Sequence, residues 1–273
     1  MGTLYVVATP IGNLQDFTPR AVEVLRTVDL IAAEDTRHSG TLRREFSIAT
    51  PMISYHHHNR ARREQQLLTA LEAGDVALIS DAGTPAIADP GQEIVAAAHA
   101  AGHLVVPVPG PSAVIAAVSA SGLVSGPFIF LGFIERKGEA RRLALGKAQQ
   151  TGWPVVLFES PQRLVDTLVE LRAVFGDRQA IVARELTKLH EEIVPGLLSE
   201  LETHFGNGDV RGEIVTVVGA GDVVAGNIDV ESIAQRLIAD GLKPSKAARE
   251  LASIADIGSD EAYELIRGLR EKS

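Results

Sequence analysis

The sequence predicts an α/β fold in two domains, followed by a small helical segment at the C-terminal end. Three observations predict it. Short apolar runs alternate with helical patterns over most of the chain, the pattern changes character around Ser125–Pro127, and helical patterns alone follow Asp229. Alternation of this kind indicates layered α/β domains with a largely parallel sheet.

The apolar runs have the length and β-branched content of buried strands. We expect strands at Leu4–Ala8, Leu30–Ala33, Met52–Tyr55, Val76–Ile79, Leu104–Val106, Phe128–Phe133, Val155–Phe158, Ala180–Ala183, Glu192–Pro195 and Ile214–Val218. Helical patterns lie between most of them. One begins with Thr18 as N-cap and Pro19 at the first helical position, and another, Asn59–Ala73, ends at Gly74.

These elements group into an N-terminal α/β domain over residues 1–112 and a second α/β domain over residues 113–225. The segment 226–273 has helical patterns at 230–239, 244–254 and 259–271. It is too short to bury much of a core of its own. We therefore expect it to be an appendix to the two larger domains.

Composition excludes several classes of protein. The chain has 273 residues and 45% apolar content, enough for a sizeable core. It has no cysteine, so disulfides, thiolate zinc sites and cysteine nucleophiles are excluded, and a reducing, cytoplasmic location is favoured. The start does not read as a signal peptide, and no run of about 18 apolar residues predicts a membrane helix.

Two loops predict a binding pocket. Ser80–Pro85 follows the strand Val76–Ile79, and Pro109–Ala113 follows the strand Leu104–Val106. Glycine and proline at the carboxyl ends of strands in an open α/β sheet mark the crevice where such folds bind ligands. Each loop alone could be an ordinary βα turn, but together they predict two walls of one pocket.

The charge distribution predicts an anionic ligand. The net charge of −9 argues against a protein coated in nucleic acid, yet Thr36–Arg63 holds six arginines, four histidines and a single acid, Glu45. The arginines are Arg37, Arg43, Arg44, Arg60, Arg62 and Arg63. A solvated helix face is the alternative, but acidic partners at helical spacing are few. Arg136, Lys137, Arg141 and Arg142 would assist these arginines. Lys243, Lys246 and Arg249 in the helical segment are weaker candidates, and packing of that segment against the second domain is the alternative.

Common nucleotide-binding and metal motifs are absent from the sequence. Pro10–Asn13 occupies the place of a Gly-x-Gly-x-x-Gly loop, and no Walker loop exists. The run His56–His58 suggests a metal, but consecutive side chains of a strand point to opposite faces and cannot converge on one ion. We expect no metal, and a polar site wall at these histidines.

Seven motifs together resemble one family. They are Thr9–Leu14, Ala33–Arg37, Ser54–His56, Ser80–Pro85, Pro109–Ala113, Phe158–Pro161 and Ala183–Lys188. The chain resembles, over essentially its whole length, the tetrapyrrole methylase superfamily and its RNA-methylating branch. Ala33–Arg37 and Ser80–Pro85 are specific to that branch. One departure is His57, where an acid is expected between the two histidines.

The resemblance implies a homodimer that binds S-adenosylmethionine between its two α/β domains. It further implies methylation of a cytidine ribose 2′-hydroxyl in the 16S RNA of the small ribosomal subunit. Domain 1–112 would bind RNA and cofactor, and domain 113–225 would complete the cleft. The expected cofactor-binding residues are Pro10, Asp81, Gly83, Ile87, Ser112, Ala113, Phe158, Glu185 and Glu213. Plain packing for Pro10 and Ile87, and an Asx-turn for Asp81, are the alternatives.

Methyl transfer to a hydroxyl requires an in-line geometry and a proton acceptor. The candidate catalytic residues are Asp35, His56, Glu185 and Lys188, and Arg37 and Arg184 would bind phosphate. An ion pair between Arg37 and Asp35 or Glu34 is the alternative. Two other functions stay open. A tetrapyrrole methyltransferase would need an apolar trough, for which 4% aromatic residues leave little material, and a non-catalytic RNA-binding or ribosome-associated protein would not bind the cofactor.

Overall fold

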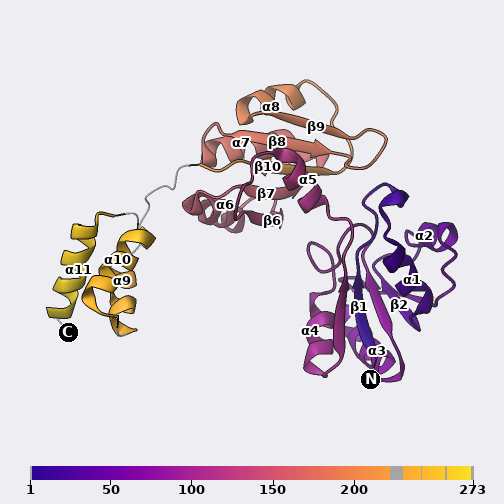
Figure 1. Cartoon of the computed structure of the whole chain (residues 1–273). Helices are drawn as coiled ribbons and strands as arrows, with labels where there is room; N and C mark the ends of the chain where they lie inside the picture. Colours follow the sequence, from indigo (N-terminus) through magenta and orange to yellow (C-terminus); the bar gives the residue numbers. More distant parts are fainter. Residues whose placement is uncertain (1, 222–229, 241, 256, 272–273) are drawn as a thin grey trace. The chain divides into compact units, whose positions relative to one another are not determined.

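The structure, a computed structural model, describes residues 2–221, 230–240, 242–255 and 257–271 (Figure 1). The chain divides into two compact units, Met1–Asp222 and Val223–Ser273. The first unit contains two five-stranded sheets. We call the part with the first sheet the first lobe, and the part from residue 113 to residue 221 the second lobe. The expected boundary at residue 225 lies outside the described residues.

The first lobe is a parallel sheet covered by helices on both faces. Its strands are β1 (Thr3–Val7), β2 (Leu30–Ala33), β3 (Met52–Ser54), β4 (Val76–Ile79) and β5 (Leu104–Val108), in the order β3-β2-β4-β1-β5. Its helices are a 3-10 turn η1 (Leu14–Asp16), α1 (Pro19–Thr27), α2 (Gly40–Glu45), α3 (Arg60–Ala73) and α4 (Gln92–Ala100). Every strand pair is parallel, as the alternation of strands and helices predicts.

The period-two alternation of side chains divides the first core into two layers. Leu25 of α1 packs with Ile31 and Ile79 on one face of the sheet. On the other face, Leu71 of α3 and Ile94 of α4 pack against strand residues such as Leu78. The neighbouring strands β1 and β4 therefore lead into helices on opposite faces. This is the topological switch point at which open α/β sheets bind ligands.

The second lobe has a mixed sheet. Its strands are β6 (Ile129–Phe133), β7 (Val155–Glu159), β8 (Gln179–Arg184), β9 (Glu192–Leu197) and β10 (Ile214–Val218), in the order β6-β7-β10-β8-β9. Only β6 and β7 pair in parallel; β10 runs antiparallel to both of its neighbours, and β8 and β9 are antiparallel. The prediction of a largely parallel sheet is therefore wrong for this lobe. The short connection between β8 and β9 holds no crossover helix, so these strands can pair only antiparallel.

Helices cover both faces of this second sheet as well. They are α5 (Ala113–Ser121), α6 (Glu139–Thr151), a 3-10 turn η2 (Pro161–Arg163), α7 (Leu164–Phe175) and α8 (Leu198–Gly206). Leu145 of α6 and Leu168 of α7 pack against Leu157 on one face. On the other face, Ala117 of α5 packs against Val156 and Val217, in the same apolar cluster as Ile11 of the first lobe.

The second unit consists of helices, as its sequence predicts. They are α9 (Val230–Ala239), α10 (Pro244–Ala255) and α11 (Ser259–Glu271). Ala234, Leu251 and Ile266 form a small buried core of their own, so the unit buries more of itself than its length suggests. Across the described parts of the chain, the search for a helix of sufficient length and hydropathy to span a bilayer finds none.

Candidate functional site

The carboxyl end of the first sheet opens into a cavity of about 480 Å³. Residues from both lobes line it. The first lobe contributes Ile11, Glu34, Asp81, Ala82, Gly83, Thr84, Ile87, Ala88, Asp89 and Ser112, and the second contributes Ala113, Val114, Phe133, Phe158 to Pro161, Leu186 and Gly212 to Val215. The cavity lies beside the switch point of the first sheet, and its volume falls in the range of small-molecule sites.

The loops after β1 and β4 form one wall of this cavity. They pair with each other, because the Thr9 amide donates to the Gly83 carbonyl at 2.8 Å and the Gly83 amide donates back to Thr9 at 3.0 Å. Gly83 has φ +77°, a left-handed conformation that favours glycine. A Cβ there would lie 3.3 Å from Cγ2 of Ile11. Ala86, in the same loop, also has a positive φ of 64°, and such strain clusters at ligand sites.

Three carboxylates converge on this wall. The Asp81 amide donates to Glu34 at 3.4 Å, and Oδ1 of Asp81 accepts a hydrogen bond from the Asp35 amide at 3.1 Å. Burial, then the nearby Asp89, raises the pKa of Glu34. Burial, opposed in part by a hydrogen bond from Ser80, raises the pKa of Asp89. Carboxylates crowded in this way favour a cation between them.

Aromatic and small polar residues form the opposite wall. The ring of Phe158 contacts Phe130 and Phe133 at centroid distances of 5.0 and 5.3 Å. Ser160 and Pro161 follow directly at the end of β7. Phe133 is 64% exposed although it lines the cavity, so an apolar surface stands at the opening. Such a mixture of apolar surface and a few polar groups is typical of sites for ligands with an aromatic ring.

A smaller pocket of about 430 Å³ adjoins the cavity. It is lined by Glu34, Asp35, Thr36, Arg37, Ser54, His56 and Asp81. Glu34 and Asp81 line both spaces, so the two spaces share a wall. A group bound in the pocket would therefore lie next to a ligand in the cavity. This pocket unites residues from three separate sequence motifs, those of Asp35 and Arg37, of His56, and of Asp81.

Asp35 and Arg37 are paired within this pocket. Nη2 of Arg37 lies 2.8 Å from Oδ2 of Asp35, and the hydrogen bonds from Arg37 lower the pKa of Asp35 to about 2. The ion pair that the sequence offers as an alternative role for these residues is therefore present. The side chain of Arg37 is still 90% exposed, which leaves its remaining donors free to bind a phosphate.

The histidines do not lie on a strand, contrary to expectation. β3 ends at Ser54, and residues 57–59 form a turn that leads into α3. The Asn59 side chain organises this turn, because its Oδ1 accepts from the His56 amide at 2.9 Å and its Nδ2 contacts Nε2 of His56 at 3.1 Å. Tyr55, the residue expected to end the strand, is buried in the first core. Within the described ranges, no group of three potential ligands could hold a metal ion.

Glu185 and Lys188 lie outside the lining of both spaces. Lys188 donates to Glu185 at 2.7 Å and to Glu213 at 2.9 Å, and the Glu213 amide donates to Glu185 at 3.0 Å. Hydrogen bonding to Lys188 lowers the pKa of Glu185, and the two carboxylates raise the pKa of Lys188 against the effect of burial. This cluster also joins the lobes, since Thr187 accepts a hydrogen bond from the Asn13 amide at 3.0 Å.

The structure brings most of the expected cofactor-binding residues together. Those that line the cavity are Asp81, Gly83, Ile87, Ser112, Ala113, Phe158 and Glu213. Pro10 and Glu185 do not line it; each lies beside a residue that does, Ile11 and Leu186. Sequence reasoning did not assign Glu34, Asp89 or Glu159 to the lining. Glu34 and Glu159 sit inside motifs of the resemblance, which is the signal that could have found them.

Some of the basic residues expected to bind RNA are exposed without a partner, and others are paired with neighbouring groups. Arg44 and Arg62 are exposed, and in the described part of the chain their side chains have no hydrogen-bond or ion-pair partner. Arg60 is paired with Glu93, Arg63 with Gln66, Arg184 with Glu192, and Arg43 donates to the Ile48 carbonyl. Arg136, Lys137 and Arg142 are exposed, as are Lys243, Lys246 and Arg249 on the other unit.

The expectation that Arg141 helps to bind RNA phosphates is wrong. The side chain of this arginine is buried, with only 4% of the residue exposed, and it binds Glu170, the Glu135 carbonyl and Thr167. It therefore cannot contact RNA. Spacing along the chain could not distinguish it from its exposed neighbour Arg142, because the two differ only in which face of α6 they occupy.

Solved structures share this fold. Diphthine synthase matches with a TM-score of 0.64 and 14% identity, over 80% of this chain and 90% of that one. A uroporphyrin-III C-methyltransferase from Thermus thermophilus, complexed with S-adenyl homocysteine, matches with a TM-score of 0.57 and 20% identity, over 82% of this chain and 99% of that one. The two lobes thus form a two-lobed α/β fold that these solved structures share.

The sequence comparisons define the family. The family model described as Tetrapyrrole (Corrin/Porphyrin) Methylases matches residues 3–202, and the chain belongs to this family of methyltransferases. Two relatives are named Ribosomal RNA small subunit methyltransferase I. The one from Synechocystis is 47% identical over 271 residues, 97% of each chain, and the one from Xylella fastidiosa is 45% identical over 258 residues, 93% of this chain and 94% of that one. The resemblance stated from the motifs is confirmed.

Proposed function

We propose that this protein is an S-adenosylmethionine-dependent methyltransferase that methylates the ribose 2′-hydroxyl of a cytidine in 16S ribosomal RNA. The observation that carries the proposal is the pair of spaces that share Glu34 and Asp81, in a chain whose relatives over nearly its whole length are named for small-subunit ribosomal RNA. One space has the properties of a cofactor site, and the adjoining one has those of an acceptor site. These relatives favour the RNA substrate over a tetrapyrrole and over a non-catalytic role.

The larger cavity fits the cofactor in size, polarity and charge. S-adenosylmethionine, when bound, supplies the methyl group from a cationic sulfonium. The raised pKa values of Glu34 and Asp89 reflect carboxylates that a bound cation would stabilise in their charged form. Apolar surface from Ile87, Phe158 and Leu186 would cover the adenine ring. The left-handed Gly83 keeps the backbone of this wall close to the ligand.

The smaller pocket fits the acceptor nucleotide. Arg37 at its edge is exposed and can bind a phosphate of the RNA backbone. The 2′-hydroxyl would then lie in the pocket, beside the wall that the pocket shares with the cavity. The proton acceptor is accordingly Asp35 or His56, which line this pocket, rather than Glu185 or Lys188, which line neither space. The pKa of Asp35, lowered to about 2 by its hydrogen bonds from Arg37, makes it a weak base, since basicity falls with pKa.

A transfer assay tests the proposal. Tritiated S-adenosylmethionine is incubated with unmethylated small subunits and, separately, with free 16S RNA, and the labelled nucleoside is then analysed. Label on the ribose of cytidine is expected, and label on a base would refute the reaction type. His56→Asn and Asp35→Asn are compared in the pH dependence of the rate. The variant that lacks the proton acceptor should lose the rate increase at rising pH.

Oligomeric state and location belong to the same proposal. The family resemblance implies a homodimer, and a ribosomal RNA substrate implies the cytoplasm. Light scattering during size-exclusion chromatography measures the mass directly. A single-chain mass at micromolar concentration would contradict the dimer and leave the proposed reaction untouched.

A further inference from the structure

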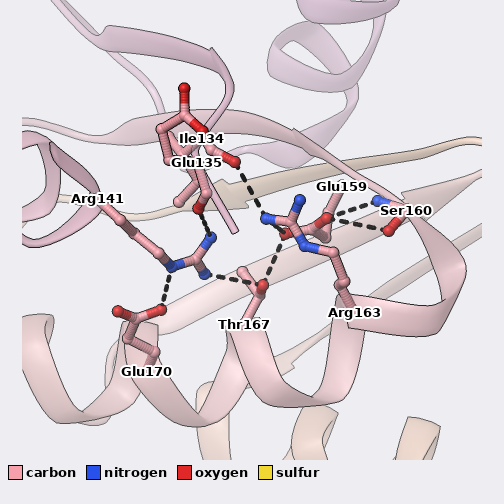
Figure 2. A network of polar contacts seen from close by, with 8 residues as sticks. All are labelled: Ile134, Glu135, Arg141, Glu159, Ser160, Arg163, Thr167 and Glu170. Atoms are coloured by element: carbon pink, nitrogen blue, oxygen red, sulfur yellow. Dashed lines mark hydrogen bonds and ion pairs between the residues drawn. The ribbon is translucent and has the colours of Figure 1, made fainter. Parts of the chain in front are cut away.

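A charged network with a buried centre includes Glu159 of the second-lobe wall of the cavity and extends behind that wall. Figure 2 shows its members, Arg141 from α6, Glu159 at the end of β7, and Arg163, Thr167 and Glu170 from η2 and α7. Glu159 is 2% exposed and Thr167 is 1% exposed. Two arginines face two glutamates, so the network is balanced in formal charge. A buried group of this size persists only when nearly all of its donors and acceptors are satisfied.

Thr167 connects the two halves of the network. Its hydroxyl donates to Oε2 of Glu159 at 2.7 Å and accepts from Nη2 of Arg141 at 3.0 Å (Figure 2). Arg163 lies 3.1 Å from the same Oε2 of Glu159. The second carboxylate oxygen of Glu159, Oε1, accepts from the amide of Ser160 at 2.7 Å and from its hydroxyl at 3.3 Å.

The network holds two segments of backbone that bound the cavity. Nη1 of Arg141 donates to the Glu135 carbonyl at 2.9 Å, and Nη2 of Arg163 donates to the Ile134 carbonyl at 3.1 Å. These carbonyls directly follow Phe133 at the end of β6, while Glu159 fixes Ser160 at the end of β7. β6 and β7 are the parallel pair of this sheet, so the network clamps their two carboxyl ends together. Both ends carry cavity-lining residues, Phe133 on one and Phe158 to Pro161 on the other.

We propose that Arg141, Glu159, Arg163 and Thr167 are positioning residues for the cofactor: they hold the ends of β6 and β7 at the spacing that forms the second-lobe wall. The inference rests on the proposed cofactor site. Arginine suits this task because its planar fork makes several directed bonds at once, whereas lysine offers a point charge. The proposal gives Arg141 a role in place of the RNA contact that its burial excludes.

The sharpest variant is Thr167→Val, which keeps the shape of the side chain and removes the hydroxyl that joins Arg141 to Glu159. We expect it to weaken binding of S-adenosylhomocysteine, measured by calorimetry on the whole chain, by about tenfold, the scale of losses when a site loses the shell that supports it. Thr167→Ser restores the hydroxyl and should restore the affinity. Arg141→Lys in the parent protein should weaken binding as Thr167→Val does. The single ammonium of lysine cannot reach all three partners of the guanidinium, which are Glu170, the Glu135 carbonyl and Thr167.

A matched control exists in the same sheet. Thr216 of β10 is fully buried, and its hydroxyl has no hydrogen-bond partner within the described residues. Thr216→Val makes the same chemical change without breaking the network, and should bind the ligand like the parent protein. The KM for S-adenosylmethionine should rise in Thr167→Val while the affinity for RNA stays unchanged. A role in stability alone would lower the unfolding midpoint and leave both ligand affinities as they are.

The outcomes separate the two proposals. If the parent protein does not bind S-adenosylhomocysteine, the proposed cofactor site is wrong. If the parent binds and folded Thr167→Val binds equally well, the cofactor site stands and the positioning role is refuted. Glu159→Gln provides a second route should Thr167→Val be unstable, because it leaves one positive charge of the network uncompensated and should give the same loss.

Discussion

Gly83 offers the most direct test of the cavity. Its φ of +77° costs a residue with a Cβ about 1–2 kcal/mol relative to glycine. A Cβ at this position also lies 3.3 Å from Cγ2 of Ile11, so the Ile11 side chain in the cavity wall must shift by a few tenths of an ångström. Gly83→Ala should therefore lower the free energy of unfolding by about 1–2 kcal/mol. Gly83→Val should lower it further, because two γ-methyl groups extend toward the same neighbour.

The control is Gly122→Ala at the C-terminal end of α5. Gly122 also has a left-handed φ, +65°, but a Cβ there meets nothing within 4 Å. Its variant has the same backbone cost and leaves the cavity intact. Urea unfolding measures the stability of each variant, and calorimetry measures binding of S-adenosylhomocysteine. We expect about tenfold weaker binding, equal to about 1.4 kcal/mol, in Gly83→Val and none of this loss in Gly122→Ala. Equal affinities in the two folded proteins would refute the placement of the cofactor at this loop.

Three further predictions concern charge. The raised pKa of Glu34 in the folded state stabilises the ligand-free fold at low pH, and this contribution is lost as the pH rises from the ordinary value of 4.5 through the raised pKa. Glu34→Gln should therefore flatten the pH dependence of the unfolding free energy on the acid side of neutrality. An unchanged pH dependence would contradict the crowding of carboxylates around Glu34. A double variant, Arg44→Gln with Arg62→Gln, should lower the slope of log RNA affinity against log salt by about 0.7–0.9 for each RNA phosphate that the protein no longer neutralises. The double variant should leave cofactor affinity unchanged. Filter-binding assays measure the salt dependence, and a salt slope equal to that of the parent protein would show that the RNA binds elsewhere. Lys188→Met should destabilise the protein by about 1 kcal/mol at neutral pH, because the largely buried carboxylate of Glu185 loses its charged partner, while the exposed Glu213 is screened by solvent and adds little. Since the lowered pKa of Glu185 stabilises the fold above the ordinary 4.5 and loses this effect as the pH falls, the cost should shrink in acid; thermal melts at two pH values measure it.

The fold was largely readable from local patterns. Each expected strand is present within a few residues, because runs such as Val76–Ile79 are both β-branched and too apolar to remain exposed. Pro19 marks a helix start through its own backbone preference, which needs no distant partner. Gly74 ends α3 in an extended conformation instead, and a Cβ there would collide with Oδ2 of Asp29, so a residue far away in the sequence requires this glycine. The two Gly- and Pro-rich loops predicted the position of the cavity from the sequence. Each directly follows a strand, and this position fixes the edge of the sheet at which the loop lies.

Long-range pairing decided what the local patterns left open. Strand direction in the second sheet depends on β10 inserting between β7 and β8, a choice made by pairing between segments far apart in sequence. Arg60 pairs with Glu93 and Arg141 pairs with Glu170, and in each pair the two residues are far apart in the sequence. A count of acidic residues near each arginine in the sequence therefore could not tell which arginines stay unpaired.

The sequence by itself thus determined the layers, the loops of the cavity and the family, because backbone preference and hydrophobic periodicity act within a few residues. Tertiary structure alone decided that Glu34 and Asp89 crowd one wall, that Asp35 and His56 share one pocket, and that Arg141 is buried behind the other wall. The physical reason is that a charged side chain takes its role from the groups it meets in three dimensions. Its residue type fixes the charge, and only packing fixes the partner.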